Sequence, residues 1–198
     1  MAQPGLARRR WVGRRMVAGS DTPPRQCCIY LRPDFSLSDS ERLANFRARF
    51  DPLHGKIPPH ITLVFPFALA EGDAGFAVET TRRIAERFVQ FPATFGAPIL
   101  SSDGYALLPL ARGAGAVRDL HNALYATETF ALFLNTDIAY VPHVTIGRTA
   151  PSDAKRTADI TAAFTEWGAT DQASVTWVIV ESFGMDEVSF VEAAISLT

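Results

Sequence analysis

Pro59-His60-Ile61-Thr62-Leu63 is the stretch from which the fold of this chain is best read, because a near copy, Pro142-His143-Val144-Thr145-Ile146, follows 83 residues later. Both copies have the pattern Pro-His-(β-branched)-Thr-(aliphatic). Successive side chains of a strand point to opposite faces, so the His and Thr of each copy share one face, about 6.5 Å apart, above an apolar underside. Two such strands facing each other across a cleft would offer two imidazoles and two hydroxyls, a set that suits a tetrahedral anion such as phosphate.

Length and composition are those of an ordinary globular protein. The 198 residues, 47% hydrophobic and 20% charged, suffice for one substantial core or for two small lobes that share one. No apolar run reaches the roughly 18 residues that a membrane-spanning helix needs. The only cysteines, Cys27 and Cys28, are adjacent. Neighbouring strand residues point apart, so no disulfide is expected, and a reducing compartment such as the cytoplasm is favoured.

Charge is distributed unevenly between a short arm and the body. Residues 1–25 hold six arginines and one acid, a net of +5, while the whole chain is −2, so that residues 26–198 carry −7. We interpret residues 1–25 as an Arg-rich, disordered N-terminal extension and assign it no function, because it lacks the apolar core of a secretory signal. The acidic body argues against an extended nucleic-acid surface and favours a small phosphorylated ligand or the end of an RNA.

The remaining pattern predicts an α+β fold of one domain, residues 26–198, with two pseudo-symmetric lobes around a central groove. The order β-α-β-α-β-β-α-β-α-β-β divides near residue 102 into lobes of about 26–102 and 103–198, with exchange of strands between them left open. A His-Thr strand follows one helix and precedes another in each half. The predicted strands are 27–31, 60–67, 94–100, 105–110, 143–148, 175–181 and 189–197, and the predicted helices are 38–50 (with Ser38 and Glu41 as a capping box), 75–91, 114–127 and 153–167.

The paired motif resembles the 2H phosphoesterase superfamily, and within it the 2′-5′ RNA ligase-like branch. The residues that carry the match are His-Ile-Thr-Leu-Val-Phe at 60–65 and His-Val-Thr-Ile-Gly-Arg at 143–148, and the similarity extends over about residues 26–197. It implies a bilobal fold and a metal-free phosphodiesterase for 2′,3′-cyclic phosphates or 2′-5′ bonds, or the reverse ligation. The catalytic histidines carry over to His60 and His143 and the phosphate-binding hydroxyls to Thr62 and Thr145.

Arg148 matches a cation that often follows the second motif in this superfamily, and we count it as a third phosphate-binding residue. In a regular strand, however, its parity puts it on the face opposite to His143. A bulge or the end of the strand would have to turn it inward.

The chemistry of these residue types agrees with the resemblance. Opening a cyclic phosphodiester requires one group that deprotonates water and one that protonates the leaving alkoxide, and imidazole can do both near neutral pH. Tyr140, just before the second motif, is the candidate for stacking on a base, whereas the parity of Phe65 predicts a core position. His54 is expected in a loop, where lining the groove is the alternative to a purely structural role. His121 is expected on the surface of a helix or half-buried.

Three other classes of protein compete with a metal-free phosphoesterase: a metal hydrolase, a binding module and a structural protein. No cofactor is implied, and the metal-hydrolase interpretation lacks any H-x-H or H-E-x-x-H spacing. A non-catalytic module that binds a cyclic phosphate or a 2′-5′ oligonucleotide is the alternative to an enzyme. A structural protein would not explain why the His-Thr pair recurs. The expected partner is a cyclic nucleotide or RNA-end substrate, with no membrane contact and a monomeric protein.

Overall fold

A computed structural model describes residues 25–68, 74–167, 171–184 and 189–198, so the predicted arm at 1–25 lies outside the described residues except for Arg25. The elements are β1 (Gln26–Phe35), α1 (Leu37–Phe50), β2 (Ile61–Ala68), α2 (Ala74–Ala85), β3 (Phe91–Phe95), β4 (Ile99–Leu100), β5 (Tyr105–Arg112), α3 (Ala114–Tyr125), the 3₁₀ turn η1 (Ala131–Phe133), β6 (His143–Arg148), α4 (Ala154–Thr165), β7 (Gln172–Phe183) and β8 (Ser189–Ser196).

The strands form one antiparallel sheet in two arms, joined through β7 and β3. In the first arm the order is β2-β1-β7, and β8 pairs with the second half of β7. The first half of β7 pairs with β3, which leads to β5, and β5 carries β4 along one edge and β6 along the other. The two motif strands, β2 and β6, are therefore the outer edges of the two arms.

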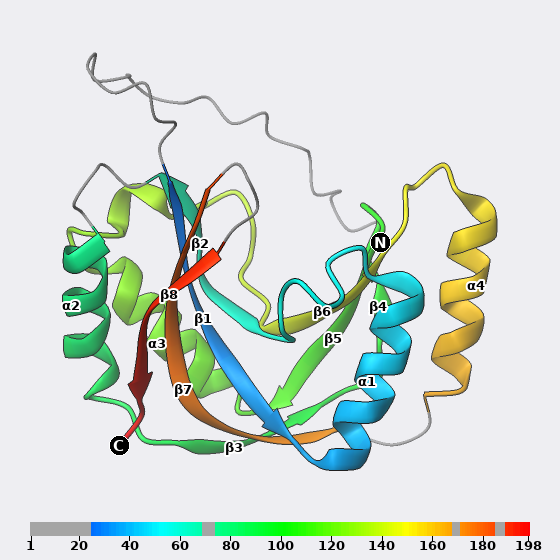
Figure 1. Cartoon of the computed structure of the whole chain (residues 1–198), viewed down its shortest axis with the longest axis horizontal. Helices are drawn as coiled ribbons and strands as arrows, with labels where there is room; N and C mark the ends of the chain where they lie inside the picture. Colours follow the sequence, from blue (N-terminus) through cyan, green and yellow to red (C-terminus); the bar gives the residue numbers. More distant parts are fainter. Residues whose placement is uncertain (1–24, 69–73, 168–170, 185–188) are drawn as a thin grey trace.

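The helices cover the outer faces of these arms. Figure 1 shows α2 and α3 on one flank and α1 and α4 on the other, with the strands between them. Helix α3 packs on β2, and α1 packs on β6. The apolar sides of the strands, such as Ile29 and Leu31 of β1 and Leu108 of β5, are fully buried against these helices. The opposite faces of the two arms carry the half-buried Thr62 of β2 and Thr145 of β6, and we call these the groove faces.

The predicted division near residue 102 is not a boundary in space, because each arm takes elements from both halves of the chain. The arm with β1 and β2 also contains β7 and β8 from the end of the chain, and the arm with β5 and β6 is covered by α1 from its beginning. The reason is that β7 pairs with β1 along the whole length of both strands. Exchange between the halves, which the sequence left open, is therefore extensive.

Most predicted elements are present, and their ends differ for identifiable reasons. Strand β1 continues through Pro33, which sits at a bulge against β7 and beyond the end of the pairing with β2. Helix α1 is capped by Ser36, whose side chain accepts a hydrogen bond from the Asp39 backbone N–H (3.2 Å), and not by Ser38. Helix α2 ends at Ala85, six residues earlier than predicted, and Phe76 is exposed.

Two other sequence expectations concern membranes and thiols. No helix in the described part of the chain combines the length and the apolar character needed to cross a bilayer. Both cysteines are free, and burial raises the pKa of each thiol to about 12. The adjacent positions in β1 thus keep the two side chains apart, as the strand geometry predicts.

Candidate active site

The two histidines occupy equivalent positions at the start of the two edge strands. His60 directly precedes β2 and His143 is the first residue of β6, and both side chains are half-buried. The strands approach each other at these ends: the Tyr140 hydroxyl, just before β6, donates a hydrogen bond to the Thr62 carbonyl of β2 (2.7 Å). Figure 1 shows β2 and β6 converging from the two flanks.

Both imidazoles are held by the same local hydrogen bond. The Nδ1 atom of His60 lies 2.9 Å from the Pro58 carbonyl, and Nδ1 of His143 lies 2.7 Å from the Val141 carbonyl. A carbonyl only accepts, so Nδ1 carries the proton in each ring and Nε2 is the nitrogen left for a substrate. The X-Pro-His sequence of each copy produces this arrangement, because the acceptor is always two residues before the ring.

Burial acts on the titration of both rings in the same direction. Burial lowers the pKa of both His60 and His143 below the ordinary value. The positive charges of Arg47 and of a protonated His143 lower the pKa of His60 further. Both imidazoles are thus biased toward the neutral form, and protonating one disfavours protonating the other.

The threonines share the groove face with the histidines, as the parity predicts. Thr62 pairs with Tyr30 of β1, and Thr145 pairs with Leu107 of β5. Both threonines are half-buried, whereas the alternate residues Ile61 and Val144 are fully buried on the core side. Each hydroxyl is therefore available next to its imidazole.

Arg148 lies on the same face as Thr145 because β6 contains a bulge. Leu107 pairs with Thr145, but the next pair is Ala106 with Gly147, so one residue of β6 is extra. The bulge restores Arg148, which pairs with Tyr105, to the groove side. Its exposed guanidinium lies over the Tyr105 ring, 4.9 Å from the centroid. The bulge in β6 is thus the irregularity without which Arg148 would face the core side.

Three ring side chains hold the outer edge of β2, and the sequence indicated none of them for that role. The Leu63 carbonyl accepts a hydrogen bond from His121 (2.8 Å), and the Tyr125 hydroxyl accepts one from the Phe65 backbone N–H (3.2 Å). Tyr140 holds the Thr62 carbonyl. His121, expected on the surface of a helix or half-buried, is instead buried and stacks on Tyr140 with their centroids 3.7 Å apart. One face of the Tyr140 ring is thus covered, and base stacking by this residue stays a prediction that concerns the other face.

The expectation that Phe65 packs in the core is wrong. Its side chain is 48% exposed, whereas Phe67 is buried. The pairing of Ile29 with Val64 and of Tyr30 with Thr62 leaves Leu63 as an extra residue in β2, so that Val64 takes the core position. The bulge therefore reverses the parity at Val64 and Phe65, so that Phe65 shares the open face with Thr62. A second register shift, between Val64 and Phe67, returns Phe67 to the core.

A buried carboxylate behind His60 was also missed. The Tyr30 ring contacts the His60 ring, with 4.9 Å between centroids, and hydrogen bonds through its hydroxyl to Glu181 of β7. Burial and this hydrogen bond raise the pKa of Tyr30, and the Glu181 charge acts to raise the pKa of His60. His143 has no such carboxylate among the causes of its shift, so the two histidines have different surroundings.

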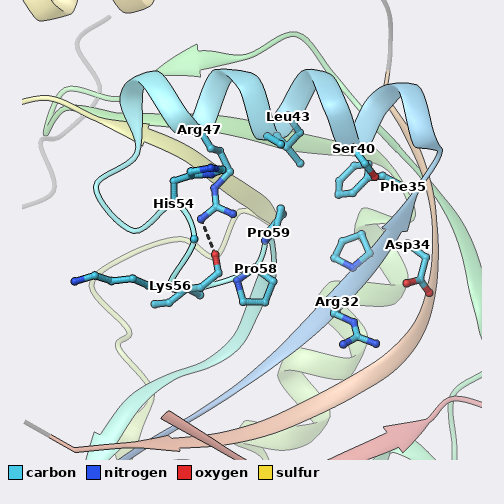
Figure 2. A pocket seen from close by; sticks show the side chains of 14 residues that line it. Arg32, Asp34, Phe35, Ser40, Leu43, Arg47, His54, Lys56, Pro58 and Pro59 are labelled. Carbon is cyan, nitrogen blue, oxygen red and sulfur yellow. Dashed lines mark hydrogen bonds between the residues drawn. The ribbon is translucent and has the colours of Figure 1, made fainter. Parts of the chain in front are cut away.

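The loop before His60 is held by Arg47 of α1. This buried side chain donates to Asp51 Oδ2 (2.7 Å) and to the Ile57 carbonyl (2.7 Å), the hydrogen bond drawn in Figure 2. His54 of the same loop lies beside Arg47 and lines a cavity that neither His60 nor His143 lines. In the described ranges, no three His, Cys, Asp or Glu side chains lie close enough together to bind a metal ion.

The family relationship agrees with the arrangement of these residues. The family model of the 2′-5′ RNA ligase superfamily matches residues 34–182, which include both motifs. The chain belongs to the 2′-5′ RNA ligase superfamily. Curated relatives of this superfamily member include provisionally named phosphoesterases of Halalkalibacterium halodurans, 33% identical over 127 residues (63% of this chain, 71% of that protein), and of Geobacillus thermodenitrificans, 31% identical over 110 residues (54% and 61%).

Solved structures of low sequence identity share the fold of this 2′-5′ RNA ligase superfamily protein. A Thermus thermophilus protein gives a TM-score of 0.61 at 15% identity, covering 87% of this chain and 97% of its own. Escherichia coli LigT in complex with phosphate gives 0.54 at 16% identity, covering 88% and 98%. The predicted α+β fold of the 2H phosphoesterases is thereby confirmed, and the family and relatives support a phosphoesterase.

Proposed function

We infer that this protein is a metal-independent phosphoesterase that opens 2′,3′-cyclic phosphates or cleaves 2′-5′ phosphodiester bonds of nucleotides or RNA ends. The single observation that carries this proposal is the matched pair of imidazoles at the converging ends of β2 and β6, each oriented through Nδ1 so that Nε2 is left for a substrate. Among the solved relatives, LigT has been crystallised with phosphate and with 3′-AMP, which supports a phosphoester ligand for this groove.

The proposed reaction needs one neutral and one protonated histidine. Nε2 of the neutral ring removes a proton from water, and the water oxygen bonds to phosphorus as the bond from phosphorus to the ribose oxygen breaks. The protonated ring gives its proton to that leaving oxygen. Thr62 and Thr145 donate hydrogen bonds to the non-bridging oxygens, and Arg148 offsets their charge.

The test separates the two nitrogens of each ring. In His60→Asn and His143→Asn the amide can keep the hydrogen bond to the carbonyl two residues earlier, but nothing replaces Nε2. We expect each variant to lose about 10²–10⁴-fold in kcat on adenosine 2′,3′-cyclic phosphate, with chelator present, while its urea unfolding midpoint stays near that of the wild type. Full activity in both variants would disprove the site.

The threonines provide a second, independent test. Removing the hydroxyl in Thr62→Val or Thr145→Val should reduce kcat by about 10²-fold, whereas Thr161→Ala, on the exposed side of α4, should have no effect. A wild-type protein that binds the cyclic phosphate in calorimetry but forms no product would instead favour the non-catalytic sensor.

A further inference from the structure

A cavity of ≈ 480 Å³ opens beside His60, between the end of β1, the helix α1 and the loop that leads to β2. Its wall combines apolar and charged groups: Phe35, Leu43 and Pro59 are among the former, and Arg32 and Lys56 among the latter. The volume lies within the range of small-molecule sites, and a mixed wall of this kind suits a flat apolar ring that bears an anionic group. The histidine pair itself does not line it, so the cavity is an addition to the site described above.

The cavity shares its wall with the segment that orients His60. Pro58 and Pro59 line it, and the Pro58 carbonyl is the acceptor for Nδ1 of His60. Arg32 continues the groove face of β1 beyond Tyr30, which contacts the His60 ring. Two residues along a strand span about 6–7 Å, so Arg32 is about that far along β1 from Tyr30, whose ring contacts the imidazole.

Arg32 differs from Arg47, the other arginine that lines the cavity, in how its guanidinium is paired. Arg47 is buried and held by Asp51 and the Ile57 carbonyl. Arg32 is exposed and forms no ion pair with a carboxylate in the part of the chain that the structure describes. Asp34, the acid of the cavity wall, instead accepts the Thr176 hydroxyl (2.8 Å). A free guanidinium at the edge of a cavity is well suited to a phosphate, which it can bind through two parallel hydrogen bonds.

We propose that this cavity is a nucleotide subsite, which receives the nucleoside next to the scissile phosphate and binds a second phosphate of the substrate through Arg32. The apolar wall contacts the base, and Arg32 provides the charge. The substrate class is then a nucleotide or RNA end that carries a phosphate besides the one attacked, in preference to a nucleoside cyclic monophosphate. This inference rests on the proposed function for the position of the scissile phosphate.

The kinetic test compares two substrates that differ by one phosphate, adenosine 2′,3′-cyclic phosphate with and without a 5′-phosphate. We expect the wild type to have a KM about 10- to 100-fold lower for the 5′-phosphorylated compound. Arg32→Gln should remove that preference and leave kcat, and the KM of the other compound, nearly unchanged. Arg112→Gln, an exposed arginine at the end of β5 outside the cavity, is the matched control and should keep the preference. An equal effect of Arg32→Gln on both substrates would overturn the proposal, as would a wild type without the preference.

A binding measurement keeps this proposal separate from the catalytic one. Calorimetric titration with adenosine 3′,5′-bisphosphate and with adenosine 3′-monophosphate needs no turnover. Tighter binding of the bisphosphate that is lost in Arg32→Gln supports the subsite, even if no cyclic phosphate is hydrolysed and the proposed reaction fails. Hydrolysis without any Arg32-dependent preference leaves the reaction intact and overturns the subsite.

The apolar wall is tested by filling the cavity. Ala44 lines it from α1 and is exposed, so Ala44→Phe adds volume there without disturbing the core. We expect KM for the adenosine substrate to rise about 10-fold or more, with no change for a small cyclic phosphate that lacks a base, such as glycerol 1,2-cyclic phosphate. Ala48→Phe, one turn further along α1 and outside the cavity, should change neither value. Unchanged adenosine kinetics in Ala44→Phe would show that the base binds elsewhere.

Discussion

In the two motif strands, the bulges determine which residues face the groove. The side chain at each of these positions then determines whether the position can bind or act on a substrate. Arg148 shares the face of Thr145 because one residue of β6 is extra, and Phe65 shares that of Thr62 because one residue of β2 is. In both strands a residue that strict alternation assigns to the core is exposed. Alternation is therefore reliable up to a bulge and reversed after it until a second register shift restores it, as the one between Val64 and Phe67 does in β2.

Phe65 and Phe67 give a prediction at this scale. Phe65 is 48% exposed and Phe67 is 2% exposed. In urea unfolding, Phe65→Ala should change the free energy of unfolding by roughly 0.5 kcal/mol or less, as surface substitutions do. Phe67→Ala should cost about 3–5 kcal/mol, because it leaves a cavity against Phe130 and Phe133. A loss at Phe65 as large as that at Phe67 would mean that β2 keeps the unbulged register, in which both residues face the core.

The difference between the two histidines can be measured through Glu181. Its negative charge acts to raise the pKa of His60. Glu181→Gln keeps an acceptor for the Tyr30 hydroxyl but removes the charge, so the pKa of His60 should fall further below its ordinary value. The limb of the pH–rate profile that follows His60 should move to lower pH, and NMR titration of the ring protons would show His143 nearly unmoved.

Glu192→Gln is the matched control for that charge. Glu192 lies on the neighbouring strand β8 and is not among the charges that shift the pKa of His60. Its replacement should therefore leave the pKa of His60 unchanged. A rise in the pKa of His60 in Glu181→Gln, or equal shifts of both histidines, would contradict the assigned influence of Glu181.

Contacts between elements fix the position of the second motif strand. Helix α1 lies so close to β6 that a Cβ added at Gly147 would meet the Phe50 Cβ at 3.0 Å and the Ala106 Cβ at 3.3 Å. Arg156 of α4 binds the Phe50 carbonyl (2.9 Å) and the Arg148 carbonyl (2.9 Å), so the end of β6 is held from both helices. The glycine of the second motif is thus explained by packing and needs no catalytic role.

Gly147→Ala should consequently destabilise the fold. We expect the free energy of unfolding in urea to fall by about 1–3 kcal/mol, as for other overpacked sites. Gly115→Ala in α3 is the matched control, because nothing lies within 4 Å of its added Cβ, and there the helix should gain roughly 0.5–1 kcal/mol. Equal stability of the two variants would show that α1 can move away from β6 at no cost.

We expect the whole molecule to fold as one unit, because each arm of the sheet is completed by the other half of the chain. Strand β7 lies between β1 and β3, and α1 crosses to the arm of β5 and β6. Neither half can bury its own strands and helices without the other. The pseudo-repeat of the sequence therefore describes the local surroundings of the two histidines, and not two independent lobes.

Fragments of the chain test this interdependence. Residues 1–102 and 103–198 expressed separately should each lack a cooperative unfolding transition in circular dichroism, since β1 and β7 would lack each other. Mixed in equal amounts, they should recover a transition and elute together. A cooperative transition of either fragment alone would restore the interpretation of two self-contained lobes.

Much of the candidate site could be predicted from the sequence. The repeated Pro-His-x-Thr pattern determines a local unit in which the proline-preceded carbonyl, the ring and the hydroxyl have one arrangement, and β6 begins and ends where the pattern predicts. These features depend on neighbours within two or three residues along the chain, so the amino-acid sequence alone determines them. The α+β class follows equally from local periodicity.

Only the tertiary structure decided the rest. The extra residues in β2 and β6, the Tyr30–Glu181 pair behind His60, the three rings that hold β2 and the cavity with Arg32 all join segments far apart in the chain. The register of a strand depends on the partner that fills its hydrogen bonds, and a cavity depends on what several elements leave unfilled. Neither quantity is a property of a short stretch of sequence.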